Sequence, residues 1–174
     1  VINHTSDGSN PNSILSYLPV SAVLSPSNSL LAYGVELTIR QGLANPQSTR
    51  ELNIARASDG FILANPTLGR GLVSDSFRGE FVGISWDPTG NSFITPNYTT
   101  VLSALGTPID LPAIVRFTNS GGNWIKTVLS TPAYINNIFP PPARTHIYPA
   151  ISPSGNSIAF FSLTWPDAIG MSQA

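Results

Sequence analysis

The sequence predicts an all-β fold, either a β-sandwich or a small β-barrel, with long loops rich in proline and glycine. Sixteen prolines and fourteen glycines are spread along the 174 residues, so few stretches are long enough for a helix. The runs between them are short and rich in valine, isoleucine, threonine, phenylalanine and tyrosine, which favour strands. The chain has no cysteine, so disulfides play no part in the fold.

We expect a single domain over residues 1–174, in which residues 1–13 form a polar loop or tail. The clearest alternation runs from Leu30 to Arg40, where Val35, Leu37 and Ile39 face one way. Four further strands are expected at Phe77–Trp86, Ala113–Phe117, Trp124–Leu129 and Ser157–Leu163.

Several shorter segments are more ambiguous. Gln47–Ile54 fits either a strand or one helical turn, and Gly60–Leu63 and Gly71–Val73 fit short strands. The segment Thr118–Gly122 contains two consecutive glycines between two apolar runs, which predicts a hairpin loop.

Three proline-containing turn sequences resemble one another, and each leads into an apolar strand. They are Ser25-Pro26-Ser27-Asn28, Asp87-Pro88-Thr89-Gly90 and Ser152-Pro153-Ser154-Gly155. They resemble the Ser-Pro-Asp-Gly hairpin of propeller blades. The intervals between them are unequal and longer than a usual blade. Two interpretations therefore stay open, a blade repeat and a hairpin that recurs only because proline and glycine suit it.

Charge is sparse, at 10% of residues with a net charge of −1, and Lys126 is the only lysine. Phosphate binding needs clustered lysine and arginine, so we expect no nucleic-acid partner. No apolar run is long enough to span a bilayer, so we expect no membrane insertion.

The sequence lacks the familiar catalytic motifs, and we expect neither an enzyme nor a cofactor or metal site. A Ser-His-Asp triad needs only one histidine, and the chain has His4 and His146. Asp87 and Asp110 are a possible carboxylate pair for glycoside cleavage. The simpler interpretation is that each aspartate caps a proline turn.

A ligand-binding surface is expected around Asn119–Trp124 and Arg144–His146. An exposed Trp124 would offer a flat face to a neutral sugar, and Asn123 an amide. Arg144 and His146 would point outward together from an extended segment. Asp110 would accept a hydrogen bond from a hydroxyl. The alternative for Trp124 is burial at the start of a strand.

Residues 68–165 contain four ordered pieces that resemble the outer protruding domain of calicivirus capsid proteins, especially those of noroviruses. The pieces are Phe77-Arg78-Gly79, Asp87-Pro88-Thr89, Leu105-Gly106-Thr107-Pro108, and Tyr148–Pro153 followed by Ala159-Phe160-Phe161-Ser162. Ile109 stands before Asp110, and the family's arginine after the paired phenylalanines is missing.

The resemblance implies a β-rich, dimeric capsid domain on the virion surface, outside the cell. It would attach to a host glycan or a protein receptor. A β-sandwich carbohydrate-binding or adhesin module from a cellular or bacterial protein is the alternative. A propeller-like scaffold and a small hydrolase are the remaining candidates.

Overall fold

The computed structural model describes residues 14–39, 47–66, 83–102, 106, 108–131 and 144–164. These residues form ten β-strands and no helix, so the predicted all-β fold is confirmed. The strands are β1 (Ile14–Leu24), β2 (Leu30–Ile39), β3 (Gln47–Arg56), β4 (Ile62–Ala64), β5 (Ser85–Trp86), β6 (Ser92–Leu102), β7 (Pro108–Ser120), β8 (Asn123–Val128), β9 (Arg144–Ile151) and β10 (Ile158–Thr164).

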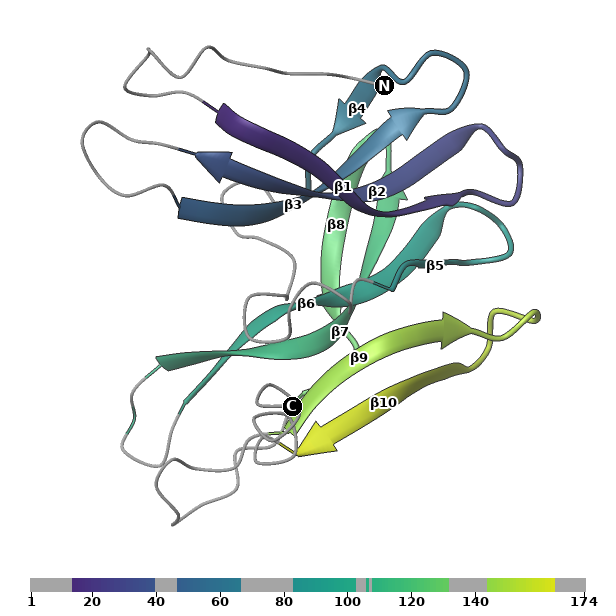
Figure 1. Cartoon of the computed structure of the whole chain (residues 1–174). Helices are drawn as coiled ribbons and strands as arrows, with labels where there is room; N and C mark the ends of the chain where they lie inside the picture. The colour runs from purple at the N-terminus through teal and green to yellow at the C-terminus, as the bar shows by residue number, and fades with distance from the viewer. Residues whose placement is uncertain are drawn as a thin grey trace, which may run out of the picture.

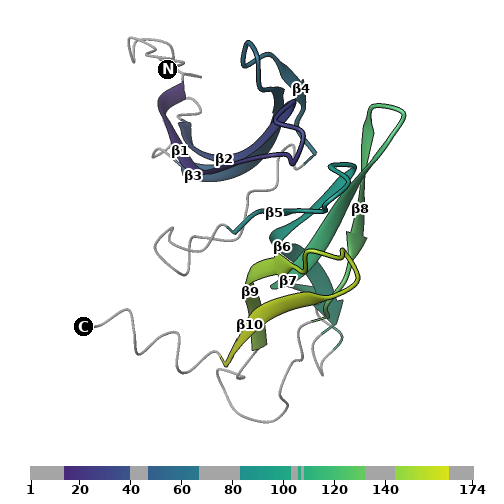
Figure 2. The ribbon, with the colours of Figure 1, turned by 90° about the vertical axis from the view of Figure 1, so that its right-hand side faces the viewer.

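The strands form three antiparallel sheets whose members follow one another in chain order. The first sheet is β1-β2-β3-β4, the second is β5-β6-β7-β8, and the third is β9-β10. The two larger sheets pack face to face, as in a β-sandwich. Figure 2 shows the three sheets in a row, with the second between the other two.

Most of the expected strands are confirmed, with shifted ends. The strand expected from Leu30 to Arg40 is β2, and the ambiguous segment from Gln47 is the strand β3. Of the strand expected at Phe77–Trp86, only Ser85 and Trp86 form a described strand. Residues 67–82, with the short strand predicted at Gly71–Val73, lie outside the described residues, as do residues 1–13.

The predicted hairpin at Thr118–Gly122 is confirmed, and its loop is only two residues long. β7 runs through to Ser120, which pairs with Asn123. Gly121 and Gly122 have φ angles of 62° and 90°, which suit glycine and allow a tight turn between twisted strands.

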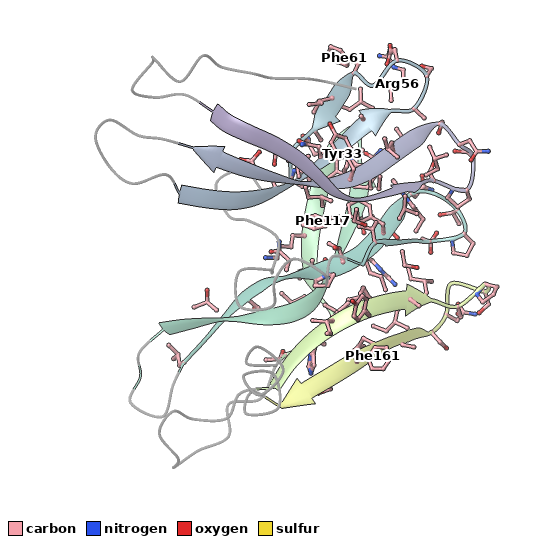
Figure 3. The ribbon with its side chains drawn as sticks, in the orientation of Figure 1. Tyr33, Arg56, Phe61, Phe117 and Phe161 are labelled. Atoms are coloured by element: carbon pink, nitrogen blue, oxygen red, sulfur yellow. The ribbon has the colours of Figure 1, made fainter. Side chains whose placement is uncertain are left out.

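The main core lies between the first and second sheets. Buried apolar side chains of the first sheet meet a larger set from the second: Ala32, Leu52 and Ile54 against Ile84, Trp86, Phe93, Val115 and Phe117. Phe117 can be seen between the two sheets in Figure 3. The ring of Phe93 lies 5.0 Å from that of Trp86 and 5.5 Å from that of Phe117, within the range of favourable aromatic pairs.

The second sheet is covered on its other face by β9. Side chains alternate along β7, so Ile114 points away from the face that holds Val115 and Phe117. Ile114 is nevertheless fully buried, and Ile147 of β9 is 2% exposed. Since β9 contacts both β6 and β7, the second sheet is the middle layer of three.

The three proline-containing turns have the same backbone hydrogen bonds. In each, the N–H of the first residue donates to the carbonyl of the sixth, over 2.8–2.9 Å. The N–H of the fourth residue donates back to the carbonyl of the first, again over 2.8–2.9 Å. That fourth residue is Asn28, Gly90 or Gly155, with φ of 57°, 76° and 76°. The three turns therefore resemble one another in structure as well as in sequence.

The turns also lie against one another, on the right-hand side of Figure 1. A Cβ atom on Gly90 would lie 3.7 Å from Cδ of Pro26 in the turn before it. A Cβ atom on Gly155 would lie 3.5 Å from Cδ of Pro88 and 3.3 Å from Oδ2 of Asp87. The fourth residue of each later turn thus approaches the proline of the preceding one.

Hydrogen bonds between residues at equivalent positions join the first strands of successive sheets, although the atoms involved differ. The indole Nε1 of Trp86 donates to the carbonyl of Val23 over 2.9 Å. In the next sheet, the N–H of Ile151 donates to Oγ of Ser85 over 3.0 Å. Trp86 and Ile151 each stand just before a turn, the second and the third. Their partners, Val23 and Ser85, each stand two residues before the start of the preceding turn.

Candidate functional surface

Trp124 belongs to the core and is not a free aromatic platform. It is half-buried near the start of β8, where its ring lies 5.4 Å from that of Phe93 and 6.1 Å from that of Trp86. Of the two interpretations of Trp124, the structure therefore favours the structural one. Asn123, just before it, is exposed next to the Gly121–Gly122 turn.

Replacing Trp124 with alanine should lower the free energy of unfolding by about 2 kcal/mol, because half of a large buried aromatic contact is lost. Thermal unfolding followed by circular dichroism measures the change. Asn123→Ala is the control, since removal of an exposed amide should change stability by less than about 0.5 kcal/mol. An unchanged melting temperature for Trp124→Ala would contradict the packing described above.

His146 is buried, so the expectation that it points outward is wrong. Its Nδ1 lies 2.7 Å from Oγ of Ser130, and its ring centroid lies 4.8 Å from that of Phe160. The same Ser130 oxygen accepts a hydrogen bond from the N–H of Ile114 over 2.9 Å. Ser130 thus connects the middle of β7 to β9, and this buried pair suits a structural link between sheets.

The remaining predicted site residues do not converge on one place. Asp110 is near the start of β7, where its backbone pairs with Thr100, and Arg144 begins β9 opposite Thr164. Their side chains lie outside the described residues. Along β7, Asp110 is about 30 Å from Asn119, which pairs with Trp124. His146 is connected through Ser130 to Ile114, which lies between Asp110 and Asn119 on β7. The five predicted residues therefore do not form a single site.

The predicted alternative of a carboxylate pair also lacks the required geometry. Asp87 Oδ1 accepts a hydrogen bond from the N–H of Thr89 over 2.8 Å and another from the Thr89 hydroxyl, so it caps its own turn. Asp110 pairs with Thr100, eight residues along β6 from Ser92 at the end of that turn. The strand rise places the two aspartates more than about 20 Å apart. Glycosidase carboxylates lie within about 10 Å of each other.

Exposed apolar side chains gather instead on the outer strands. Phe61 and Ile62 lie at the start of β4, and the Arg56 guanidinium is 5.6 Å from the centroid of the Phe61 ring. On the third sheet, Phe161 is 64% exposed, and its ring lies 6.2 Å from that of Tyr148. Figure 3 shows Phe61 and Phe161 on the two outer sheets.

The sequence contained a signal for this second group. Consecutive residues in a strand point to opposite faces, so a Phe-Phe pair is fully buried only in a sheet covered on both sides. In the described part of the chain, the third sheet packs on the second sheet through β9, and both Phe160 and Phe161 of β10 are exposed.

Among the residues that the structure describes, no three histidine or acidic side chains are grouped so that they could hold a metal ion. The same residues include no helix with the length and hydropathy of a membrane span. No family model matches the chain, and no curated protein or solved structure is significantly similar to it.

Proposed function

We propose that this chain is a scaffold of repeated, blade-like sheets whose role is to bind other polypeptides, not to catalyse a reaction. The observation that carries the proposal is the stacking of the three turns. Gly90 approaches Pro26, and Gly155 approaches Pro88, so the same contact joins successive sheets. A hairpin that recurred by chance would have no reason to contact its predecessor at equivalent atoms.

The arrangement of the sheets supports the same proposal. Each larger sheet is a four-stranded antiparallel meander in chain order, which is the form of a propeller blade. Repeat architectures bury their core between neighbouring units, and the core described above lies between two sheets.

Attachment of a virion to host glycans is the second candidate. Two of the four pieces that resemble the calicivirus domain are Asp87-Pro88-Thr89 and the segment ending at Ser152-Pro153. Both belong to the repeated turns, whose hydrogen bonds explain their sequences locally. The scaffold is favoured for this reason. Homodimer formation stays a prediction of the capsid hypothesis, and sedimentation of the full chain checks it.

A pair of glycine substitutions tests the stacked turns. Gly60 and Gly155 both have positive φ, so alanine at either position should cost about 1–2 kcal/mol of stability through backbone strain. A Cβ atom at Gly60 meets nothing within 4 Å, whereas one at Gly155 meets Asp87 and Pro88 of the previous turn. We expect Gly155→Ala to lose about 1 kcal/mol more than Gly60→Ala, measured by urea unfolding.

Equal losses of stability in Gly155→Ala and Gly60→Ala would overturn the stacked-turn scaffold. Binding of the full chain to an array of neutral oligosaccharides addresses the second candidate. The scaffold predicts no glycan-specific signal. A specific signal that is lost in Asn123→Ala would favour the attachment module, because Asn123 is exposed and its replacement should leave the fold intact.

A further inference from the structure

Equivalent residues are buried in the first two sheets and exposed in the third. The register fixes the equivalence, since the residue before each turn pairs with the residue that follows the sixth residue of that turn: Leu24 with Leu31, Trp86 with Phe93, and Ile151 with Ile158. The next three residues are buried in β2 (Ala32-Tyr33-Gly34) and in β6 (Ile94-Thr95-Pro96). In β10 they are Ala159-Phe160-Phe161, and all three are exposed.

The difference follows from the number of strands that pair with β10 among the described residues. β2 pairs with β1 and β3, and β6 pairs with β5 and β7. Within the described part of the chain, β10 pairs with β9 alone. One edge of β10 therefore presents backbone N–H and C=O groups that a further strand could pair with.

The other outer strands carry features that discourage such pairing, and β10 does not. β4 and β5 are only three and two residues long. β8 carries Lys126, and β1 contains Pro19 with a register shift beside it. Short length, lysine, proline and bulges all protect sheet edges. β10 is seven residues long and contains no charge and no proline. Its pairing with β9 has a register shift, but the extra residue is on β9, since Ala159–Phe161 lies opposite Ala150–Ile147.

We propose that the free edge of β10 binds an extended polypeptide segment in antiparallel pairing, as the third strand of its sheet. The inference rests on the proposed scaffold, because β3 and β7 occupy this place in the other two sheets. Phe160 and Phe161 point to opposite faces, so the bound strand needs apolar residues on both of its faces. β7 has this property, since Ala113, Ile114 and Val115 are all fully buried. Main-chain pairing supplies the affinity, and these side chains select the segment.

The test uses the full chain and a synthetic peptide with the β7 sequence, residues 108–120. Binding is measured by fluorescence anisotropy of the labelled peptide, and hydrogen exchange maps the protected amides. We expect saturable binding with slower exchange across residues 158–164. Phe161→Lys should weaken binding at least about tenfold, because a lysine on the edge opposes pairing. Ile125→Lys, at a position of β8 that is also more than half exposed, is the matched control and should bind normally.

A peptide carrying Ile114→Pro should fail to bind, because proline removes an N–H from the strand and disfavours extended pairing. Equal binding by the proline peptide, or protection outside residues 158–164, would overturn the proposal. So would concentration-dependent protection of β10 in the chain alone, since the occupant would then be a second copy. The scaffold proposal is tested separately, by the difference in stability between Gly155→Ala and Gly60→Ala. If that difference is found, any of the results above overturns only the proposal about β10.

Discussion

Replacing Phe93 with alanine is expected to lower the free energy of unfolding by about 3–5 kcal/mol, the usual cost of deleting a fully buried phenylalanine ring. Phe93 is 0% exposed, and its ring packs against those of Trp86, Phe117 and Trp124. The cavity would lie where the first and second sheets meet, with few side chains free to fill it. Urea unfolding followed by tryptophan fluorescence measures the loss, since Trp86 and Trp124 border the site.

Phe161→Ala is the matched control for Phe93→Ala. The same atoms are removed, but Phe161 is largely exposed, so the change in stability should stay below about 1 kcal/mol. If Phe93→Ala and Phe161→Ala lower the free energy of unfolding by the same amount, the first and second sheets do not share the core described here.

Replacing Ser130 with alanine is expected to lower the free energy of unfolding by about 2–4 kcal/mol. The change removes the acceptor of the Ile114 N–H and the partner of His146 Nδ1, both of which are buried. Each buried polar group that loses its partner costs about 1–3 kcal/mol. Hydrogen exchange of the Ile114 amide should accelerate as well, because β9 is no longer connected to β7 through this hydroxyl.

Two variants isolate the role of the Ser130 hydroxyl. Ser130→Thr keeps the oxygen and should recover most of the lost stability. Ser154→Ala removes a hydroxyl from the exposed β9–β10 turn, where water replaces the lost contact, and should change stability by less than about 0.5 kcal/mol. A Ser130→Ala protein as stable as the parent would contradict the link between β7 and β9.

Local chemistry allowed much of the fold to be predicted. The strand β2 was expected from apolar alternation, and β8 and β10 were expected as apolar runs that follow a turn rich in glycine, proline or serine. The two-glycine hairpin and the three proline turns were recognisable for the same reason. These features depend on neighbours in sequence, so no knowledge of the tertiary structure was needed.

Strand ends were harder to predict because proline was taken as a boundary. β7 was expected to begin at Ala113, yet it starts at Pro108 and includes Pro112. β6 contains Pro96, which pairs with Ile114. β5 ends its pairing at Ile94, so within the described residues the other edge of β6 at Pro96 is unpaired. Proline is tolerated on such an edge, where no ladder hydrogen bond is lost.

The candidate site could not be predicted because it depends on which sheets cover which faces. Trp124 follows a glycine hairpin, which suggests exposure, but its ring packs against Phe93 and Trp86 in the core between the two sheets. His146 follows a run of prolines in sequence, but it is buried against Ser130, which lies just after the last strand of the second sheet. The edge of β10 that is unpaired among the described residues is likewise a property of the whole arrangement. Burial of this kind is decided by residues far apart in the chain.

The direction of the turn contacts has a consequence for synthesis on the ribosome. Each sheet pairs strands that are adjacent in sequence, so its hairpins close short loops and can form while the rest of the chain is still being made. Gly90 meets a proline that has already emerged, and Gly155 meets the next one in turn. Each new sheet can therefore pack on a sheet that has already been synthesised, and assembly can proceed from the N-terminal sheet toward the C-terminal one.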